Sequence, residues 1–232
     1  MTKLANEAAR AEWVRVQLES LKPGLKLLDA GAGERQYHKH CGHLDYTSQD
    51  SECYIPDDKG AGLQMPKWNY DSIDIRCDII HIPRPEDSFD AILCTEVLEH
   101  IPNAVPAITE FSRLLKPGGI LLLTAPFCSL THFAPFHYST GFSKYWYEHH
   151  LTAHGFRIES ITPNGNHFEY LRQEILRLPT VAKQYAGVKK RSLKDRILTK
   201  LFAKHLEKLS DRDTGSHELL AYGFHVRAVK LD

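Results

Sequence analysis

The sequence predicts an α/β fold, a mostly parallel β-sheet with helices on both faces. Short apolar segments alternate along the chain with segments of helical periodicity, the order expected of strands joined by crossover helices. Two strand candidates, FDAILC (89–94) and ILLLTAP (120–126), are continuously apolar, as expected of strands that are covered on both faces. The chain has 232 residues, and we expect a single domain over residues 1–232.

The first third of the chain predicts one helix and three strands. Apolar residues at helical spacing predict a helix over residues 4–20, which Pro23 and Gly24 end. Residues 51–72 are polar and rich in Gly, Pro and Asp, which predicts a loop insertion with little regular structure. The strands are expected at LKLLDAG (25–31), LDYTSQD (44–50) and SIDIRCDI (72–79).

The rest of the chain continues the alternation of strands and helices. After the strand at 89–94, the segment PAITEFSRLL (106–115) has the apolar spacing of a helix, with Pro106 suited to its first turn. The residues KPGG then end this helix before the strand at 120–126. Later elements are expected as a helix near 142–154, a strand near 156–161 and a last strand within 219–229.

The overall composition is that of an ordinary globular protein, with 42% hydrophobic and 25% charged residues. The formal net charge is zero, so no global field favours nucleic acid as a partner. The N-terminal residues lack the apolar core of a signal peptide, and no segment is apolar enough to span a membrane. Five cysteines without a CxxC pair indicate reduced thiols. We therefore expect a cytoplasmic protein.

The segment LLDAGAGE (27–34) predicts a ligand-binding turn after a buried strand. Gly31 and Gly33 allow backbone angles and a close approach that a Cβ atom would block. A dinucleotide-binding fingerprint would have a third glycine at position 36, where this chain has Gln36. A nicotinamide-dependent oxidoreductase is therefore poorly supported, and two glycines alone do not identify the ligand.

Polar groups at the ends of the following strands narrow the choice of ligand. Asp50 ends the second strand, where a carboxylate can accept hydrogen bonds from both hydroxyls of a ribose. Asp78 and Ile79 end the third strand and suit the edge and face of an adenine, and Cys94 ends the fourth. Each acid alone could equally be a capping or solvated residue. Together, at the carboxyl ends of parallel strands, they predict an adenosine site.

These segments resemble the class I S-adenosylmethionine-dependent methyltransferases, in particular the type-11 branch that includes quinone-biosynthesis enzymes. The resemblance covers roughly residues 25–160 and rests on LDAGAGE, on Asp50 and on the continuous segment 78–127, which contains CTEVLEH and LKPGG. It implies a Rossmann-like, seven-stranded sheet whose last strand is inserted antiparallel. The segment LLAYGFHVRAV (219–229) fits that strand.

The resemblance also implies S-adenosyl-L-methionine as cofactor and gives each strand end a role. Gly31 and Gly33 would contact the methionine end of the cofactor, and Asp29 would support their loop. Asp50 would hold the ribose. The loop insertion at 51–72 departs from the family, which has a short helix there.

Three further cofactor contacts follow from the same resemblance. Asp78 and Ile79 would frame the adenine, and the backbone of Cys94 would lie against the cofactor. The departure at 51–72 puts the details of this adenine wall in question.

Histidines and aromatic residues gather after the fifth strand, in residues 129–155, where this fold usually builds its acceptor pocket. His132 and His137 are the main candidates for a general base that takes a proton from an acceptor hydroxyl. His100 is a further catalytic candidate, although its family position is usually interpreted as structural. No convincing cluster of Asp, Glu and His ligands can be assembled from the sequence, so we expect no metal.

The acceptor itself is not fixed by these motifs. Aromatic rings mixed with histidines suit a sugar or glycan hydroxyl, and the segment also resembles type-11 members associated with bacterial surface-glycan assembly. A quinone-like or lipid acceptor is the alternative. A catalytically silent cofactor-binding protein is the alternative of another class, and intact Asp29, Gly31, Gly33, Asp50 and Asp78 argue against loss of the cofactor site.

A basic helical insertion is expected at about 181–213. Residues 183–213 contain ten Lys or Arg and four Asp or Glu, and apolar residues recur at helical spacing over 192–209. The first interpretation is a helix that packs on the domain with a solvated outer face. A homodimer contact or peripheral contact with an anionic membrane surface are the alternatives.

Overall fold

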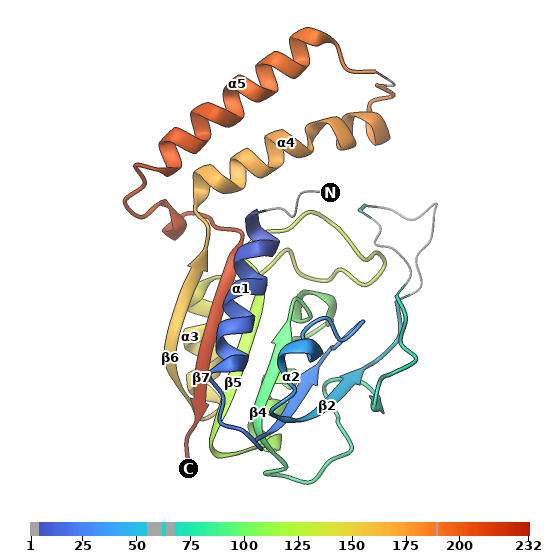
Figure 1. Ribbon diagram of the computed structural model, residues 1–232, viewed down its shortest axis with the longest axis vertical. Coiled ribbons are helices and arrows are strands. Elements are labelled where there is room, and N and C mark those ends of the chain that lie inside the picture. Colours follow the sequence, from blue (N-terminus) through green and yellow to red (C-terminus); the bar gives the residue numbers. More distant parts are fainter. Residues whose placement is uncertain (1–4, 55–61, 64–67, 189) are drawn as a thin grey trace.

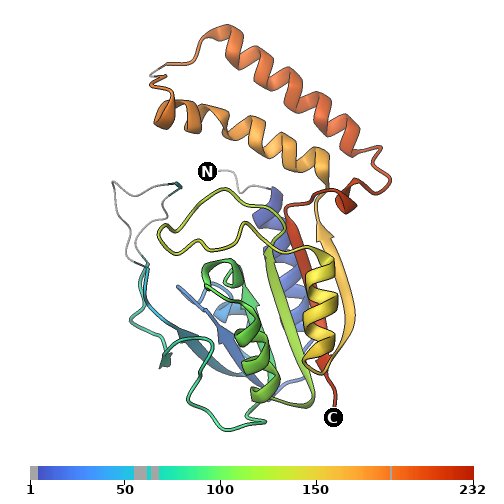
Figure 2. The same cartoon turned by 180° about the vertical axis from the view of Figure 1, so that it is seen from behind.

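The computed structural model describes residues 5–54, 62–63, 68–188 and 190–232. A β-sheet forms the middle layer, with helix α1 on one face and helices α2 and α3 on the other (Figures 1 and 2). The helices of these outer layers are α1 (Ala5–Glu19), α2 (Val105–Leu114) and α3 (Lys144–Ala153). The helices expected near 4–20, 106–115 and 142–154 are therefore confirmed.

Within the described part of the chain, seven strands form one sheet in the order β3-β2-β1-β4-β5-β7-β6. Strand β7 runs antiparallel between β5 and β6, and the pairs among the first five strands are parallel. The predicted Rossmann-like sheet with an antiparallel last strand is thus confirmed. The strands are β1 (Lys26–Ala30), β2 (Asp45–Asp50), β3 (Ile75–Arg76), β4 (Phe89–Thr95), β5 (Leu115–Pro126), β6 (Phe156–Asn164) and β7 (Gly223–Lys230).

Strand β3 is much shorter than the strand expected over 72–79. Ile75 and Arg76 pair with the end of β2. At the preceding residue, the side chain of Asp74 contacts β2 in place of backbone pairing. Its Oδ2 accepts hydrogen bonds from the backbone N–H and the hydroxyl of Ser48, at 2.8 and 2.5 Å. After β3, Asp78 accepts a hydrogen bond from the backbone N–H of Ile80 at 3.1 Å, so the chain turns away from the sheet.

Strand β5 is longer than expected because the residues KPGG lie inside it as an irregularity. Leu115 already pairs with Phe89, and regular pairing resumes where Ala91 meets Ile120. Gly118 adopts a φ of +76° in the intervening turn, a conformation that favours glycine. The residues that end helix α2 therefore also begin the strand.

The predicted loop insertion at 51–72 lies partly outside the described residues. Its described parts (51–54, 62–63 and 68–72) contain no helix, and Leu63 forms an isolated β-bridge with His132. The insertion therefore contacts the loop that follows β5.

The insertion between β6 and β7 is a helical hairpin, α4 (His167–Tyr185) and α5 (Leu193–Ser210), and it projects beyond the carboxyl ends of the strands (Figure 1). The sequence analysis did not predict α4. Asn166 caps its first turn by accepting the N–H of Glu169, and Pro179 lies within it. Ser192 and Asp195 form a capping box that starts α5 close to the expected residue 192.

Two apolar clusters hold the layers together. On one face of the sheet, Phe111 of α2 and Leu151 of α3 are fully buried against the strands, and on the other face Val14 and Leu18 of α1 are fully buried. Each of these side chains contributes about 1.5–3 kcal/mol by its removal from water. This packing fixes the strands, so the carboxyl ends of all strands except the antiparallel β7 meet at one edge of the sheet.

Candidate functional site

The glycine loop after β1 is held in a conformation that requires glycine. Gly31 and Gly33 have φ values of +76° and +52°. A Cβ atom on Gly31 would lie 2.4 Å from Cγ2 of Val97. The N–H groups of Gly31 and Ala32 donate to the carbonyl oxygen of Gln49, each at 2.9 Å. The loop is therefore fixed against the end of β2.

Gln49 is a buried residue of this site that the sequence analysis missed. Its side-chain Oε1 accepts from Gly31 N–H at 3.2 Å, and its Nε2 donates to the carbonyl oxygen of Cys77 at 2.7 Å. The amide thus joins the glycine loop to the segment after β3. A polar residue inside a buried strand was the signal that could have identified it.

Asp50 lies at the end of β2, where the sequence places a ribose-binding acid. Its Oδ2 accepts the N–H of Gly33 at 2.9 Å, and its Oδ1 accepts the N–H of Glu52 at 2.8 Å. Burial raises the pKa of this carboxyl, and the two N–H donors act in the opposite direction. The carboxylate is directly next to the glycine loop and fits a role at the ribose.

Asp29 is buried at the end of β1 and contacts a neighbouring strand. Tyr46 of β2 donates its hydroxyl to Asp29 Oδ2 at 2.7 Å. Burial raises the pKa of Asp29 to about 6, partly offset by this hydrogen bond. Asp29 therefore supports the loop indirectly, through the β1–β2 pair.

The other predicted cofactor residues lie at the same edge but differ in exposure. Asp78 is exposed, whereas the side chain of Ile79 is buried in the core and Ile80 is 40% exposed. The thiol of Cys94 is fully buried, and burial raises its pKa well above the ordinary value. Ile79 would thus contact a ligand only from its buried position in the core, and Cys94 would do so through its backbone. Both roles stay predictions.

An aromatic cluster from distant segments covers the glycine loop. A Cβ atom on Gly33 would lie 2.5 Å from the ring of Trp68, which shows how closely this ring lies on the loop. The Trp68 ring packs against Phe133 at 4.8 Å between centroids, and Phe133 packs against Tyr54 at 3.9 Å and His100 at 4.9 Å. The cluster connects the glycine loop to the histidines. The sequence analysis missed Trp68, which lies in the predicted loop insertion.

The three histidines predicted from the sequence come together. His100 lies in the 3₁₀ turn Leu98–His100 after β4, and His132 and His137 lie in the loop after β5. The His132 ring lies 4.7 Å from the His100 ring and 4.9 Å from the His137 ring. One ligand atom from each histidine lies within 4.8 Å of the other two. His149, His150 and His154 lie on or beside α3, outside this cluster.

Hydrogen bonds to backbone carbonyls orient two of these imidazoles. His100 Nδ1 lies 2.5 Å from the carbonyl oxygen of Phe136, and His132 Nδ1 lies 2.9 Å from that of Leu130. Neither ring nitrogen of His137 has a partner among the described residues. Burial lowers the pKa of His100 to about 4 and lowers the pKa of His137, so both imidazoles are neutral near pH 7.

Glu99 lies under the histidines and was not identified from the sequence. Its side chain is 0% exposed, and neither carboxylate oxygen has a hydrogen-bond partner among the described residues. Burial raises the pKa of Glu99 well above its ordinary value. The nearby Glu96 differs, because Arg10 and Thr124 pair with it at 3.0 and 2.9 Å. Glu99 is therefore the unpaired acid of the site.

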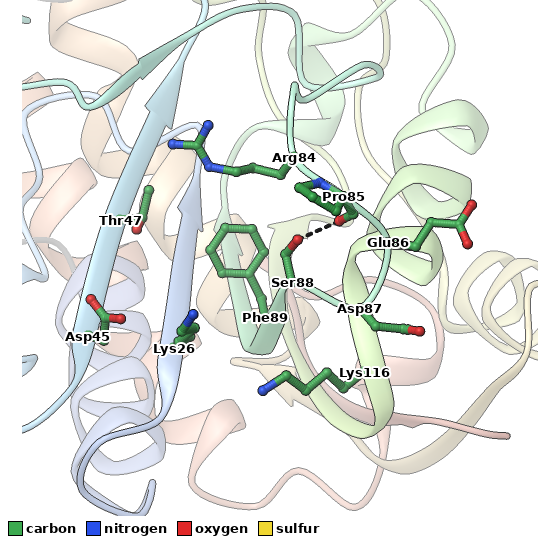
Figure 3. Close-up of a pocket in the computed structure, with 10 residues that line it drawn as sticks. All are labelled: Lys26, Asp45, Thr47, Arg84, Pro85, Glu86, Asp87, Ser88, Phe89 and Lys116. Atoms are coloured by element: carbon green, nitrogen blue, oxygen red, sulfur yellow. Dashed lines mark hydrogen bonds between the residues drawn. The ribbon is translucent and has the colours of Figure 1, made fainter.

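Two cavities among the described residues lie beside or away from this edge. A cavity of about 460 Å³ next to the glycine loop is lined by Glu34, Arg35 and Asn69. Another, of about 400 Å³, lies where β1, β2 and β4 begin and is lined by Lys26, Asp45 and other residues (Figure 3). No predicted site residue lines this second cavity, so it is not the predicted cofactor site.

Comparisons with known proteins agree with the motifs. A family model described as a methyltransferase domain, of the type-11 group, matches residues 28–123. A sterol 24-C-methyltransferase from Gibberella zeae is 30% identical over 116 residues, which are 48% of this chain and 30% of that protein. A demethylmenaquinone methyltransferase from Mycobacterium tuberculosis is 25% identical over 178 residues, which are 73% of this chain and 68% of that protein.

A solved structure shares the fold across nearly the whole chain. The structure of a SAM-dependent methyltransferase from Archaeoglobus fulgidus aligns with a TM-score of 0.58 and 15% identity, over 97% of this chain and 94% of that one. The sequence match to the sterol enzyme is more local, since this chain spans less than a third of that protein's length. The family model covers the glycine loop and the strand-end acids Asp50 and Asp78.

Proposed function

We propose that this chain, which carries a class I S-adenosylmethionine-dependent methyltransferase domain of the type-11 branch as its motifs predicted, methylates a hydroxyl of a sugar or glycan. The observation that supports this acceptor is the histidine cluster beside the glycine loop. Imidazoles and aromatic rings provide hydrogen bonds and stacking surfaces for a polyhydroxylated ring. The cluster lies at the carboxyl ends of β4 and β5, next to the residues that would hold the cofactor.

The residues of the chain would position the acceptor and take its proton. The cofactor supplies a methyl group on a sulfonium, which is already a good leaving group. His137 is the general base of this proposal, because its ring nitrogens have no partner among the described residues. When bound, the cofactor would supply the methyl group to the hydroxyl oxygen and leave as the thioether, and a nitrogen of His137 would take the hydroxyl proton.

Calorimetry tests the cofactor site first. The chain is expected to bind S-adenosylhomocysteine, and NADH is the comparison ligand. Binding of NADH without binding of S-adenosylhomocysteine would contradict the proposed cofactor. The acceptor is then identified by a screen of nucleotide sugars, glycans and phenols for transfer of a labelled methyl group. Transfer to phenols alone would reject the sugar acceptor, and cofactor binding without turnover on any class would favour a silent binding protein.

A quinone-like or lipid acceptor is the second candidate function. The related proteins named above are a sterol and a demethylmenaquinone methyltransferase. The aromatic cluster of Tyr54, Trp68 and Phe133 could equally pack against a flat apolar ring. The same acceptor screen separates the two candidates, provided that a soluble quinol analogue is included.

We also propose that α5 contacts an anionic membrane surface, while the enzyme works in the cytoplasm. Leu193, Ile197 and Leu201 follow one another at four-residue spacing and are 71%, 50% and 61% exposed. Lysines and arginines outnumber acids by ten to four over 183–213. An exposed apolar stripe on a basic helix is the pattern of a peripheral membrane contact. No helix in the described ranges is long and apolar enough to cross a membrane.

A further inference from the structure

The side chains of Glu99, His100 and His132 lie close together, but no hydrogen bond joins the carboxylate of Glu99 to either imidazole. Glu99 Oε1 lies 3.7 Å from His100 Nε2 and 3.9 Å from His132 Nε2. Both distances exceed those of a hydrogen bond. The three side chains come from two segments, and the N–H groups of Tyr138 and Ser139 join these segments by donating to the carbonyl oxygen of Glu99 at 3.0 and 3.2 Å.

The backbone contacts of the two histidines determine which nitrogen is free. A carbonyl oxygen can only accept, so Nδ1 carries the hydrogen in both His100 and His132. In the neutral imidazole, Nε2 then presents a lone pair. Both Nε2 atoms lie within 4 Å of Glu99 Oε1, and the carboxylate can only accept when it is ionised. A cation between the ionised carboxylate and the two nitrogens would stabilise this arrangement.

This arrangement has the features of a metal site. An imidazole that binds a metal through Nε2 usually donates its Nδ1–H to a carbonyl or a carboxylate. Glu99 adds a carboxylate that is 0% exposed and has no hydrogen-bond partner among the described residues, and its ionised form is costly to bury unless a cation compensates it. The orientation of the histidines and the burial of the acid are independent observations.

We propose that His100 Nε2, His132 Nε2 and Glu99 Oε1 bind a divalent transition-metal ion, with Zn²⁺ as the ion that fits best. Two imidazoles and a carboxylate form a known catalytic zinc ligand set that leaves one position open. Zinc–nitrogen distances of about 2.0–2.1 Å place neighbouring ligand atoms about 3.4 Å apart in a tetrahedral site. The observed 3.7 and 3.9 Å therefore need to shorten by less than 1 Å on binding.

In this proposal His137 lies beside the open coordination position rather than among the ligands, although one ligand atom from each of the three histidines lies within 4.8 Å of the other two. An acceptor hydroxyl that completes the coordination of the ion would have its pKa lowered by the metal and would lie near His137. This role of the ion rests on the proposed methyl transfer, whereas metal binding itself does not.

Metal binding is tested on the full chain after treatment with a chelator. We expect titration with Zn²⁺ to show one equivalent bound per chain, and substitution with Co²⁺ to give the visible absorption of a tetrahedral site. His132→Ala and Glu99→Gln are expected to weaken Zn²⁺ binding at least tenfold, as judged by competition with a coloured chelator. His149→Ala, on the exposed side of α3, is the matched control for adventitious binding by surface histidines and should leave the stoichiometry unchanged.

Each outcome decides for or against the metal site. His137→Ala is expected to retain the Zn²⁺ equivalent, and S-adenosylhomocysteine binding should be unaffected in all of these variants, which also shows that they fold. Absence of a stoichiometric equivalent would overturn the site. A Glu99→Gln variant that binds Zn²⁺ as tightly as the parent would also overturn the site. Glutamine resembles a neutral carboxyl, so unchanged affinity would show that Glu99 does not bind the ion as a carboxylate. Loss of the equivalent in His149→Ala would assign the ion to the surface instead.

Discussion

The backbone N–H of Gly33 donates to the carboxylate of Asp50 at 2.9 Å, so the glycine loop and the predicted ribose acid are physically joined. The loop is held on its other side by the carbonyl oxygen of Gln49. The end of β2 therefore provides both the anchor of the loop and the acid beside it. A substitution of Asp50 is therefore expected to weaken cofactor binding in two ways. It removes the ribose contact, and it loosens the glycine loop.

Asp50→Ala should lower the affinity for S-adenosylhomocysteine about 100-fold or more. Hydrogen bonds to a charged group are worth about 1.5–3 kcal/mol each, and the carboxylate can accept two from a ribose. Calorimetry measures the loss. Asp45→Ala, at the exposed opposite end of the same strand, is the control and should bind as the parent does. Equal affinity in the Asp50 variant would place the ribose elsewhere.

Trp68 is expected to report cofactor binding by its fluorescence. Its ring lies on Gly33, the face of the loop where the cofactor would approach, so binding must change its surroundings. The other two tryptophans, Trp13 and Trp146, lie on α1 and α3. Adding S-adenosylhomocysteine should shift the emission of the parent and of Trp146→Phe, and the shift should be lost in Trp68→Phe. A full shift in Trp68→Phe would show that this ring does not cover the site.

Burial of Asp29 predicts a pH dependence of stability in the ligand-free chain. The pKa of Asp29 is about 6 in the folded chain against 3.8 for the free side chain, so the folded state holds the proton more tightly. Stability should therefore fall as the pH rises from about 4 to about 6, by about 3 kcal/mol, and change little above that. Urea unfolding measured across this range gives the slope.

Asp29→Asn should remove that part of the pH dependence. The amide oxygen of asparagine can still accept the Tyr46 hydroxyl, while the titration is gone. A variant with the same slope as the parent would assign the titration to another buried acid, such as Asp50, whose pKa is also raised by burial.

The parts of the fold that could be predicted are those set by local sequence. A continuously apolar strand such as 89–94 is stable where both faces of the sheet are covered, and the structure confirms this strand. Helix α4 was missed although its apolar residues recur at helical spacing, because Pro179 lies inside it and its start depends on the cap at Asn166. Strand β3 is short because Asp74 turns to Ser48, a contact that only the folded chain creates.

The site was partly predictable for the same reason. His132 and His137 could be selected because they lie in one short aromatic loop after a strand. The role of Glu99 depends on its complete burial and on a contact with His132, 33 residues further along the chain. Trp68 reaches Gly33 from the loop insertion, whose path has no periodicity that a sequence pattern could use. Long-range contacts of this kind become visible only in the structure.

His137→Ala is expected to suppress methyl transfer at least 100-fold while the affinity for S-adenosylhomocysteine stays within about twofold. General-base catalysis contributes roughly 10²–10⁴-fold, and His137 contacts the histidine cluster rather than the glycine loop. Turnover is measured with the acceptor found in the screen. His149→Ala, on the exposed side of α3, is the control. Unchanged turnover in His137→Ala would move the base to another group.

Helix α5 should bind vesicles that contain an anionic phospholipid and leave neutral vesicles unbound. Each basic residue near such a surface contributes about 1 kcal/mol, and the attraction weakens as salt is added. Replacing the exposed residues Leu193, Ile197 and Leu201 by serine should abolish co-sedimentation with the vesicles without loss of folding. Leu219→Ser is the matched control, because Leu219 is 74% exposed but lies outside the hairpin. A dimer in solution that the same triple substitution dissociates, without vesicle binding by the parent, would instead make the stripe a contact between two copies of the chain.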